Sequence, residues 1–360
     1  MTIGGATYDI FLHENICPLR YYCDQSGDFL LIPQGRKVEF SRVHYATGGG
    51  ATNTAVAFAR QGLRVTTFFI IGDDSQGNFI LNELSREQID RGSVVQLPGQ
   101  ITGTSVIVPA SSGEGSLLVC HGVGNTMQAI QIPLSVIAQQ EYLYIAPLPV
   151  AELLPVIVEY ARAQSIKYIA INPGTNQLYV HPEYLYESLR FVDCLILNTA
   201  EAIQLFHWLV GEKKINIPMA TLKKNDGSSV PPLLLFFSSY QGVTYTLDQY
   251  TSAILALGPK TVVITDGAAG AYVGTRSQIF FHPSFKVEIS NTVGAGDAFG
   301  ATFVASVARG FSIEQALFRG ICNSSSVLQG ADAKSGLLSA EQLDKAVQQQ
   351  QINLVQCFNY

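Results

Sequence analysis

The chain has 360 residues, of which 47% are hydrophobic and 14% charged, and a formal net charge of -6. These values indicate a globular protein with apolar side chains for one large core or two modest ones. The negative charge, without any block of lysines or arginines, argues against nucleic acid as a partner. No apolar run reaches the length of about 18 residues that a membrane span needs, so we expect no membrane partner.

The N-terminus lacks a basic region followed by a long apolar stretch, so we expect no signal peptide and a cytoplasmic location. The six cysteines are scattered, with no CxxC pair and no His/Cys cluster at metal-site spacing. We therefore expect reduced thiols, most of them buried.

In chain order, residues 11–45 are the first region that lacks helical patterns, and residues 100–121 are a second such region. Both contain strand-like pieces joined by Gly/Ser turns, without intervening helices, and so predict a small antiparallel sheet inserted into a main domain. Asp9 follows the first apolar run, where it can accept hydrogen bonds from a diol. The alternative for Asp9 is a turn residue after a strand.

A glycine-rich segment, TGGGATNTAVAFARQG, follows the first of these regions. Its glycines let the backbone approach a ligand closely, and Asn53 offers both a donor and an acceptor at the start of a predicted helix. An uncharged, hydroxyl-rich ligand suits such a surface. A glycine turn that packs a helix on a sheet is an equally good interpretation.

From about residue 140, short apolar runs alternate with helical patterns, which is typical of β-α units feeding a parallel sheet. The predicted strands are YLYIAP, KYIAINP, CLILNT and TVVITDG, and the predicted helices lie in ELLPVIVEYARAQ, EAIQLFHWLV, AFGATFVASVARG and IEQALFRGICNSSSVLQ. Each strand ends in a polar or glycine-bearing segment, where ligands bind in open α/β sheets. Residues 207–243 break the alternation and are interpreted as a surface excursion.

Asn198 and Glu201 stand three apart at the start of a predicted helix. This spacing makes a capping box, which we weigh slightly above the functional alternative. In that alternative the two residues orient water around Mg²⁺, which binds through few protein oxygens and several waters.

Near the C-terminus, NTVGAGDAFG precedes a predicted helix. Gly294 and Gly296 can expose successive N–H groups, and the helix that starts near Ala295 adds its own unsatisfied donors, so the turn can hold an anion. Asp297 is then either a residue favoured in a first helical turn or a catalytic group. A Walker loop is excluded because the chain has no Gly-Lys-Ser/Thr. A dinucleotide fold is disfavoured because Glu314, the acidic residue at the required spacing, lies in a helical run.

The motifs together resemble the ribokinase-like (PfkB-type) carbohydrate kinase family. They are GGGATNTAVAFARQG, GDDSQG, HGVGNT, INPG, NTAE, TDGAAGAYV and NTVGAGDAFGATF, and the resemblance covers nearly the whole chain. It implies a three-layer αβα fold with a central, mostly parallel sheet and a small β-sheet lid. We expect one domain over residues 1–360, with lid insertions at about 11–45 and 100–121.

The resemblance also implies an activity: transfer of the γ-phosphate of ATP to a hydroxymethyl group of a sugar or nucleoside, with ATP and Mg²⁺ as cofactors. By the same resemblance, the general base is Asp297 and the anion hole is Gly294, Ala295 and Gly296. The residues implied in acceptor binding are Asp9, Gly49, Gly50, Asn53 and Asn125. Those implied at the nucleotide are Asn198, Asp266, Gly267, Gly270 and Asn323, with Glu201 serving the metal.

Three features depart from the family pattern. Asn291 replaces the usual first aspartate of the late motif, which makes potassium activation doubtful, and Gly50 stands where ribokinases carry lysine, which disfavours ribose as the acceptor. The excursion at 207–243 is longer than is common. The alternative function is a degenerate kinase that senses a metabolite without turnover, and we expect the exposed lid edges to allow a homodimer.

Overall fold

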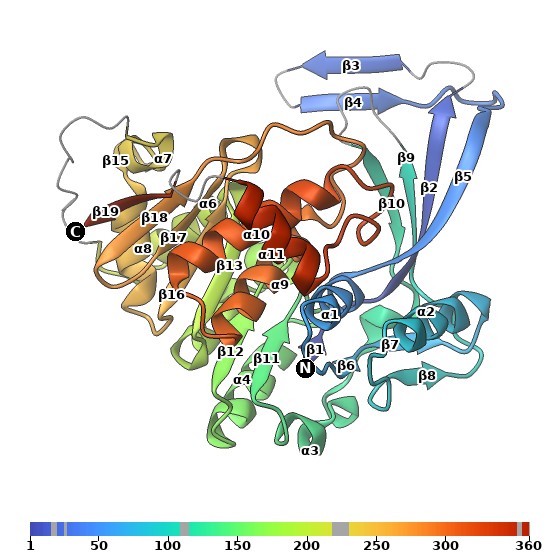
Figure 1. The fold of residues 1–360 in the computed structure, drawn as a ribbon, viewed down its shortest axis with the longest axis horizontal. Helices are drawn as coiled ribbons and strands as arrows, with labels where there is room; N and C mark the ends of the chain where they lie inside the picture. Colours follow the sequence, from blue (N-terminus) through green and yellow to red (C-terminus); the bar gives the residue numbers. More distant parts are fainter. Residues whose placement is uncertain (16–19, 25–26, 109–114, 218–229, 351–354, 360) are drawn as a thin grey trace.

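The computed structural model describes residues 1–15, 20–24, 27–108, 115–217, 230–350 and 355–359. Its centre is a nine-stranded sheet in the order β19-β18-β17-β16-β13-β12-β11-β1-β6 (Figure 1). The neighbouring strands from β16 to β6 are parallel, whereas β17, β18 and β19 pair antiparallel. The strands are β1 (Thr2–Ile3), β6 (Thr67–Phe68), β11 (Tyr142–Ile145), β12 (Tyr168–Ile171), β13 (Cys194–Asn198), β16 (Thr261–Thr265), β17 (Ala271–Gly274), β18 (Gln278–His282) and β19 (Gln356–Asn359).

The four strands predicted from the apolar runs after residue 140 are confirmed as β11, β12, β13 and β16. Their side chains alternate between two separate cores because successive residues of a strand point to opposite faces. Leu195 and Leu197 of β13 belong to one core, and Cys194 and Ile196 to the other. Both faces of the sheet are therefore buried, as a parallel sheet requires.

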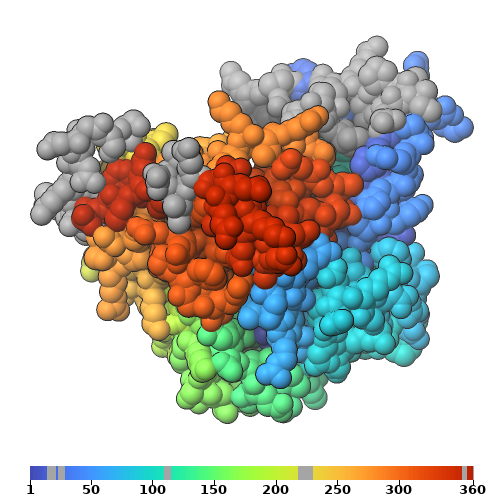
Figure 2. Space-filling view, viewed as in Figure 1, coloured from blue at the N-terminus to red at the C-terminus, as the bar shows by residue number. Residues whose placement is uncertain are grey.

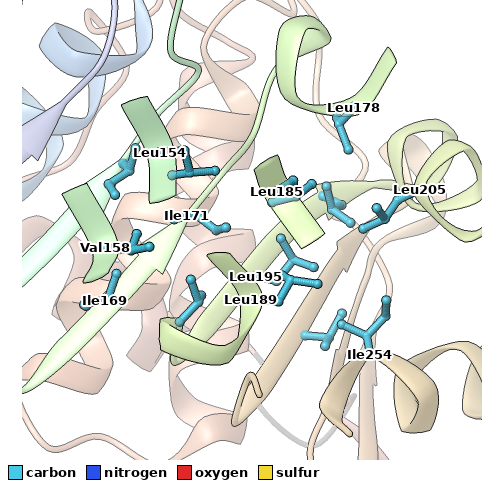
Figure 3. Close-up of a cluster of buried hydrophobic side chains, with 14 of the residues drawn as sticks. Leu154, Val158, Ile169, Ile171, Leu178, Leu185, Leu189, Leu195, Leu205 and Ile254 are labelled. Carbon is cyan, nitrogen blue, oxygen red and sulfur yellow. The ribbon is translucent and has the colours of Figure 1, made fainter. Parts of the chain in front are cut away.

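Helices cover both faces of this sheet, which confirms the αβα architecture. On one face lie α1 (Gly50–Arg60), α9 (Ala295–Ala308) and α10 (Ile313–Val327), with α11 (Ala340–Gln349) packed on α10. In Figure 2 the helices near the C-terminus, in orange and red, occupy the centre of the face in view. On the other face lie α4 (Leu153–Ala163), α5 (Pro182–Ser188), α6 (Thr199–Gly211) and α8 (Leu247–Leu255). Figure 3 shows how Leu154 and Val158 of α4 meet Ile169 and Ile171 of β12 in this second core.

A four-stranded sheet in the order β10-β9-β2-β5 forms the lid. It consists of β2 (Thr7–Asn15), β5 (Phe40–Gly48), β9 (Thr104–Val108) and β10 (Ser116–Cys120), and a separate hairpin of β3 (Arg20–Asp24) and β4 (Gly27–Leu31) lies above it (Figure 1). The chain enters β2 directly after β1, so the lid stands at the carboxyl edge of the parallel strands. The prediction of an antiparallel lid sheet is wrong in one pair, because β2 and β9 run parallel while the other neighbouring lid strands run antiparallel. The first lid strand begins at Thr7, before the predicted insertion at 11–45. Asp9 therefore lies within a lid strand and is not a turn residue.

The remaining elements are short or peripheral. They are β7 (Ile70–Gly72), α2 (Ser75–Arg86), β8 (Val95–Leu97), α3 (Leu134–Ile137), α7 (Pro232–Leu235), β14 (Ser238–Tyr240) and β15 (Val243–Tyr245). The predicted excursion at 207–243 contains the end of α6, α7 and the β14–β15 hairpin, and its residues 218–229 lie outside the described part of the chain. None of the helices among the described residues is both long and apolar enough to cross a membrane.

Candidate active site

The N-terminus of α9 presents free backbone donors to open space. Gly294 caps the helix with φ 84°, a left-handed conformation that glycine adopts without strain. No acceptor among the described residues is assigned to the N–H groups of Gly296 and Asp297, and a Cβ added to Gly296 would meet nothing within 4 Å. With the positive end of the helix dipole, this turn can hold an anion.

The N-terminus of α1 is built from the glycine-rich segment. Gly49 caps it with φ 87°, and a Cβ there would lie 2.5 Å from the carbonyl oxygen of Gly5. A Cβ on Gly48 would lie 1.9 Å from Oδ2 of Asp9. These two positions therefore require glycine because the chain segments of β1, β2 and β5 meet there.

The two helix starts face each other. Nδ2 of Asn53, in the first turn of α1, donates to Oδ2 of Asp297, in the first turn of α9, at 2.7 Å. Oδ1 of Asn53 is buried and has no hydrogen-bond partner among the described residues, so it can accept a hydrogen bond from a ligand hydroxyl. Burial raises the pKa of Asp297, and the bond from Asn53 and the charge of Lys334 offset part of that shift.

Asp9 lies next to the same glycines. Oγ1 of Thr7 donates to its carboxylate at 2.8 Å, and Asp9 is 4% exposed. Burial raises the pKa of Asp9, while hydrogen bonds from Thr7 and Ser105 and the charge of Lys334 act against that shift. The structure thus brings together Asp9, Gly49, Gly50, Asn53, Gly294, Ala295, Gly296 and Asp297 at the carboxyl edge of the sheet, under the lid.

Polar groups after β13 and β16 line the neighbouring part of this edge. Asn198 and Glu201 form the capping box of α6, because Asn198 Oδ1 accepts from the N–H of Glu201 and Glu201 Oε2 accepts from the N–H of Asn198, both at 2.9 Å. Oγ1 of Thr199 donates to Asp266 at 2.8 Å, which joins α6 to the loop containing Gly267 and Gly270. In that loop Gly267 is exposed, whereas Gly270 is buried and has a φ of 127°.

In the capping box, Oε2 of Glu201 is the carboxylate oxygen that accepts a hydrogen bond, and the charge of Asp297 acts on this carboxylate. Burial raises the pKa of Glu201, and the charge of Asp297 raises it further. A divalent cation between such carboxylates would relieve their repulsion, and one or two carboxylates with water and phosphate oxygens form the donor set that Mg²⁺ prefers. Among the described residues no group of three or more His, Cys, Asp or Glu side chains gathers.

Two predicted site residues have no hydrogen bond to this cluster among the described residues. Asn125 lies in an exposed 3₁₀ turn, and no hydrogen bond within the described residues joins it to Asp9, Asn53 or Asp297. Asn323 is 0% exposed. Its Nδ2 donates to Oγ1 of Thr302 at 2.7 Å, and its Oδ1 accepts from the N–H of Leu338 at 2.9 Å. In this structure Asn323 joins α10 to α9 and to the segment at Leu338.

Residues that sequence reasoning missed lie in the loop after α10. Nε2 of His44, on lid strand β5, lies 2.7 Å from Oδ2 of Asp332, and the side chain of Lys334 is buried beneath the glycine-rich segment. Nδ2 of Asn291 donates to the carbonyl of Gly330 at 2.6 Å, so this departure from the family pattern has a structural partner. The only signal in the sequence is a lysine among small residues, GADAKSG, and no periodicity reveals what it contacts.

Comparison with known proteins gives a consistent result. Residues 19–216 and 237–339 match the model of the pfkB family carbohydrate kinases. The chain is 27% identical over 310 residues to the ribokinase of Staphylococcus aureus (strain COL), covering 84% of each chain. It is 25% identical over 342 residues to the ribokinase of Schizosaccharomyces pombe, covering 93% of each chain. The fold resembles that of Arabidopsis thaliana ribokinase complexed with ribose and ATP, with a TM-score of 0.71, 17% identity and coverage of 96% of this chain and 97% of that one.

Proposed function

Because this chain belongs to the pfkB family of carbohydrate kinases, we propose that it transfers the γ-phosphate of ATP to a hydroxymethyl group of a sugar or nucleoside. The family and the ribokinase relatives imply sugar kinase activity in general. The observation that carries the specific proposal is the 2.7 Å bond between Asn53 and Asp297, which joins two glycine-rich helix starts at the edge where ligands bind.

In this proposal Asp297 is the general base. Phosphoryl transfer passes through a loose, in-line transition state, so catalysis consists mainly of positioning and charge stabilisation. An acceptor hydroxyl next to Asp297 loses its proton to the carboxylate as the bond to phosphorus forms. The raised pKa of Asp297 makes it a better base than an exposed aspartate.

The turn at 294–296 receives the charge of the migrating phosphoryl group. The unassigned N–H groups of Gly296 and Asp297 and the positive end of α9 are fixed before substrate arrives, whereas the N–H of Ala295 donates to the carbonyl of Thr292 at 3.4 Å. On the acceptor side, Asp9 and Asn53 bind hydroxyl groups and Gly49 allows close approach. Residues of the lid sheet exclude water, which competes with the alcohol as acceptor.

ATP would lie along the ends of β13 and β16, against Asn198, Asp266, Gly267 and Gly270, with Glu201 facing the phosphates. Mg²⁺ supplies charge neutralisation at the β- and γ-phosphate oxygens when bound. The roles of Asn125 at the acceptor and of Asn323 at the nucleotide stay predictions from the resemblance.

Ribose is not the favoured acceptor in this proposal, because Gly50 stands where ribokinases carry lysine. A Cβ on Gly50 would lie 2.6 Å from the Cβ of Ala146 and 3.1 Å from Pro147, so a lysine at position 50 would require these residues to move. This crowding supports the interpretation that the acceptor is recognised without the lysine found in ribokinases.

The test is a coupled ADP-release screen with D-ribose, D-fructose and adenosine as first acceptors. We expect ADP release that depends on an acceptor and on Mg²⁺, with ribose weaker than the best acceptor. Ligand-induced melting shifts without any ADP release would instead support the sensor alternative.

Glu201→Gln tests the metal assignment. The substitution removes the charge but keeps an oxygen that can accept from the N–H of Asn198, so the helix start is retained. We expect the Mg²⁺ concentration for half-maximal rate to rise severalfold. A magnesium titration identical to that of the parent would leave Glu201 as a capping residue alone.

A further inference from the structure

Lys334 is a buried lysine that contacts three separate parts of the molecule. Its side chain is 4% exposed. Nζ lies 2.9 Å from the carbonyl oxygen of Thr47, 2.9 Å from Oγ1 of Thr52 and 2.9 Å from Oε2 of Glu83, and it also donates to Oγ1 of Thr47. The loop after α10 is thereby joined to the end of lid strand β5, to helix α1 and to helix α2.

These bonds act on the peptide groups that shape the acceptor loop, residues 47–53. Oγ1 of Thr52 donates to the carbonyl of Gly48 at 2.7 Å while it accepts from Lys334. The ammonium group thus holds the carbonyl of Thr47 directly and the carbonyl of Gly48 through one hydroxyl. The next residue, Gly49, is the N-cap of α1, whose first turn carries Asn53 to Asp297.

The lysine is itself rigidly placed. Oδ1 of Asp332 accepts from the N–H groups of Lys334 and Ser335 at 2.8 and 2.7 Å, and Oγ of Ser335 accepts from the N–H of Ala331 at 2.9 Å. A loop held in this way presents its side chain with little loss of conformational entropy.

The same loop also packs against the anion turn. A Cβ added to Gly294 would lie 2.4 Å from the Cβ of Ala333, and Asn291 bonds the carbonyl of Gly330. Asp332 reaches lid residue His44 at 2.7 Å. Residues 330–336 therefore touch the acceptor loop, the anion turn and the lid at once.

Stability alone does not account for this arrangement. Taking an ammonium group out of water costs free energy that its ion pair repays only in part, and apolar replacements of buried ion pairs are often neutral or stabilising. Glu83 is 27% exposed, so its carboxylate keeps some hydration without the lysine. The hydrogen bonds from the buried ammonium group fix the position of the acceptor loop, and this placement accounts for the buried charge.

We propose that Lys334 is a positioning residue that holds residues 47–53, and with them Asn53, in register with Asp297 and the 294–296 turn. This inference rests on the proposed kinase function and adds to it a residue that contacts neither substrate. Lys334 acts through the carbonyl groups of Thr47 and Gly48, and its removal is expected to affect the acceptor more than ATP.

The test compares Lys334→Met, the double variant Lys334→Met/Glu83→Gln and the control Lys345→Met with the parent. The double variant removes both charges, so no carboxylate is left without its partner if the single variant folds poorly. Lys345 is 67% exposed and pairs with Glu341 on α11, away from the site. Amide hydrogen exchange of the full-length protein without substrate is measured for peptides covering residues 45–56, together with melting temperature.

Kinetics are measured with ATP and with whichever of D-ribose, D-fructose and adenosine the parent turns over. We expect faster exchange in residues 47–53, a melting temperature within a few degrees of the parent, and a loss of at least about tenfold in kcat/KM for the acceptor, because small misplacements of reacting groups have effects of this size. The KM for ATP should stay within about twofold of the parent value. The control Lys345→Met should change neither the exchange of residues 47–53 nor the kinetics.

Parental exchange and parental acceptor kinetics in the double variant would overturn the proposal. A rise in exchange throughout the protein, with equal losses of kcat/KM for ATP and for the acceptor, would assign Lys334 to general stability. That result would overturn the proposal as well. If the parent turns over no acceptor, the kinase proposal fails, while the exchange measurement alone still decides whether Lys334 holds residues 47–53.

Discussion

Asp297 is a residue on which two effects act in opposite directions. The start of α9 and the bond from Asn53 favour its carboxylate form, whereas burial favours the protonated form and raises its pKa. The result is a carboxylate that is basic enough to accept a proton yet is held in one orientation. Both interpretations of Asp297, a first-turn residue and a general base, are compatible with this geometry, and only a substitution separates them.

Asp297→Asn separates the two roles because asparagine keeps the shape and a hydrogen-bond acceptor but cannot take a proton. We expect a melting temperature within a few degrees of the parent and a loss of most turnover, on the order of 10²–10⁴-fold for a general base. Thermal melting and steady-state kinetics are the measurements. A variant that retained parental turnover would assign Asp297 to the helix start alone.

The raised pKa of Asp297 also predicts a pH dependence. Burial raises this pKa above its usual value of 3.8, so kcat/KM should fall as the pH falls through the raised pKa and the base becomes protonated. For stability the sign is opposite: the ionised group destabilises the fold above the raised pKa, and this penalty is relieved as the pH falls. The melting temperature of Asp297→Asn should therefore equal or exceed that of the parent at neutral pH, and the difference should shrink in acid.

The N-terminus of α9 is the element that combines shape and charge at the site. Gly294 and Gly296 are both glycine, but for different structural reasons. Gly294 has a positive φ and is packed against Ala333, whereas Gly296 has regular helical surroundings and open space above it. The first is required by the backbone, and the second leaves room for a ligand.

Gly294→Ala and Gly296→Ala form a matched pair. The first should lower the free energy of unfolding by at least about 1–2 kcal/mol, because alanine is strained in the left-handed region. The second should leave stability unchanged or slightly higher, since alanine favours helices by about 0.5–1 kcal/mol over glycine, and yet reduce turnover by narrowing the anion turn. Denaturant unfolding and kinetics distinguish these outcomes; equal effects on both readouts would contradict the assignment of Gly296 to the anion turn.

At the scale of the whole molecule, the lid leaves apolar surface on an edge strand. Leu117, Leu118 and Val119 of β10 are 50%, 54% and 44% exposed, and β10 lies at one edge of the lid sheet. An apolar edge strand without charged side chains is a template for pairing with another chain. The homodimer through the lid stays a proposal, and this strand is the surface that supports it.

Sedimentation velocity tests the lid dimer. We expect the parent to sediment as a dimer at micromolar concentration and Leu118→Lys to shift toward monomer, because a lysine on an edge strand opposes pairing. Val156→Lys is a suitable control, since Val156 is 44% exposed on α4 and far from the lid in the fold. A parent that is monomeric under these conditions would exclude the proposal.

Much of this fold could be predicted from local patterns. Runs such as YLYIAP and CLIL predict buried strands because both faces of a parallel sheet are apolar, and NTAE predicts a capping box because its spacing is local. The glycines at 48–50 and 294–296 are likewise local signals of tight backbone turns. For this reason the αβα architecture and the two helix starts could be predicted from the sequence.

Contacts between distant segments depended on the tertiary structure. Asn53 and Asp297 are 244 residues apart, and only the packing of α1 beside α9 brings them within 2.7 Å. Asn323 is buried, and its amide contacts α9 and the segment at Leu338. Lys334 carries no local signal although it holds the acceptor loop. Hydrophobic periodicity reports which face of an element is buried, whereas the neighbours of a polar side chain depend on how whole elements cross. That is why the elements could be predicted and the partners of Lys334 could not.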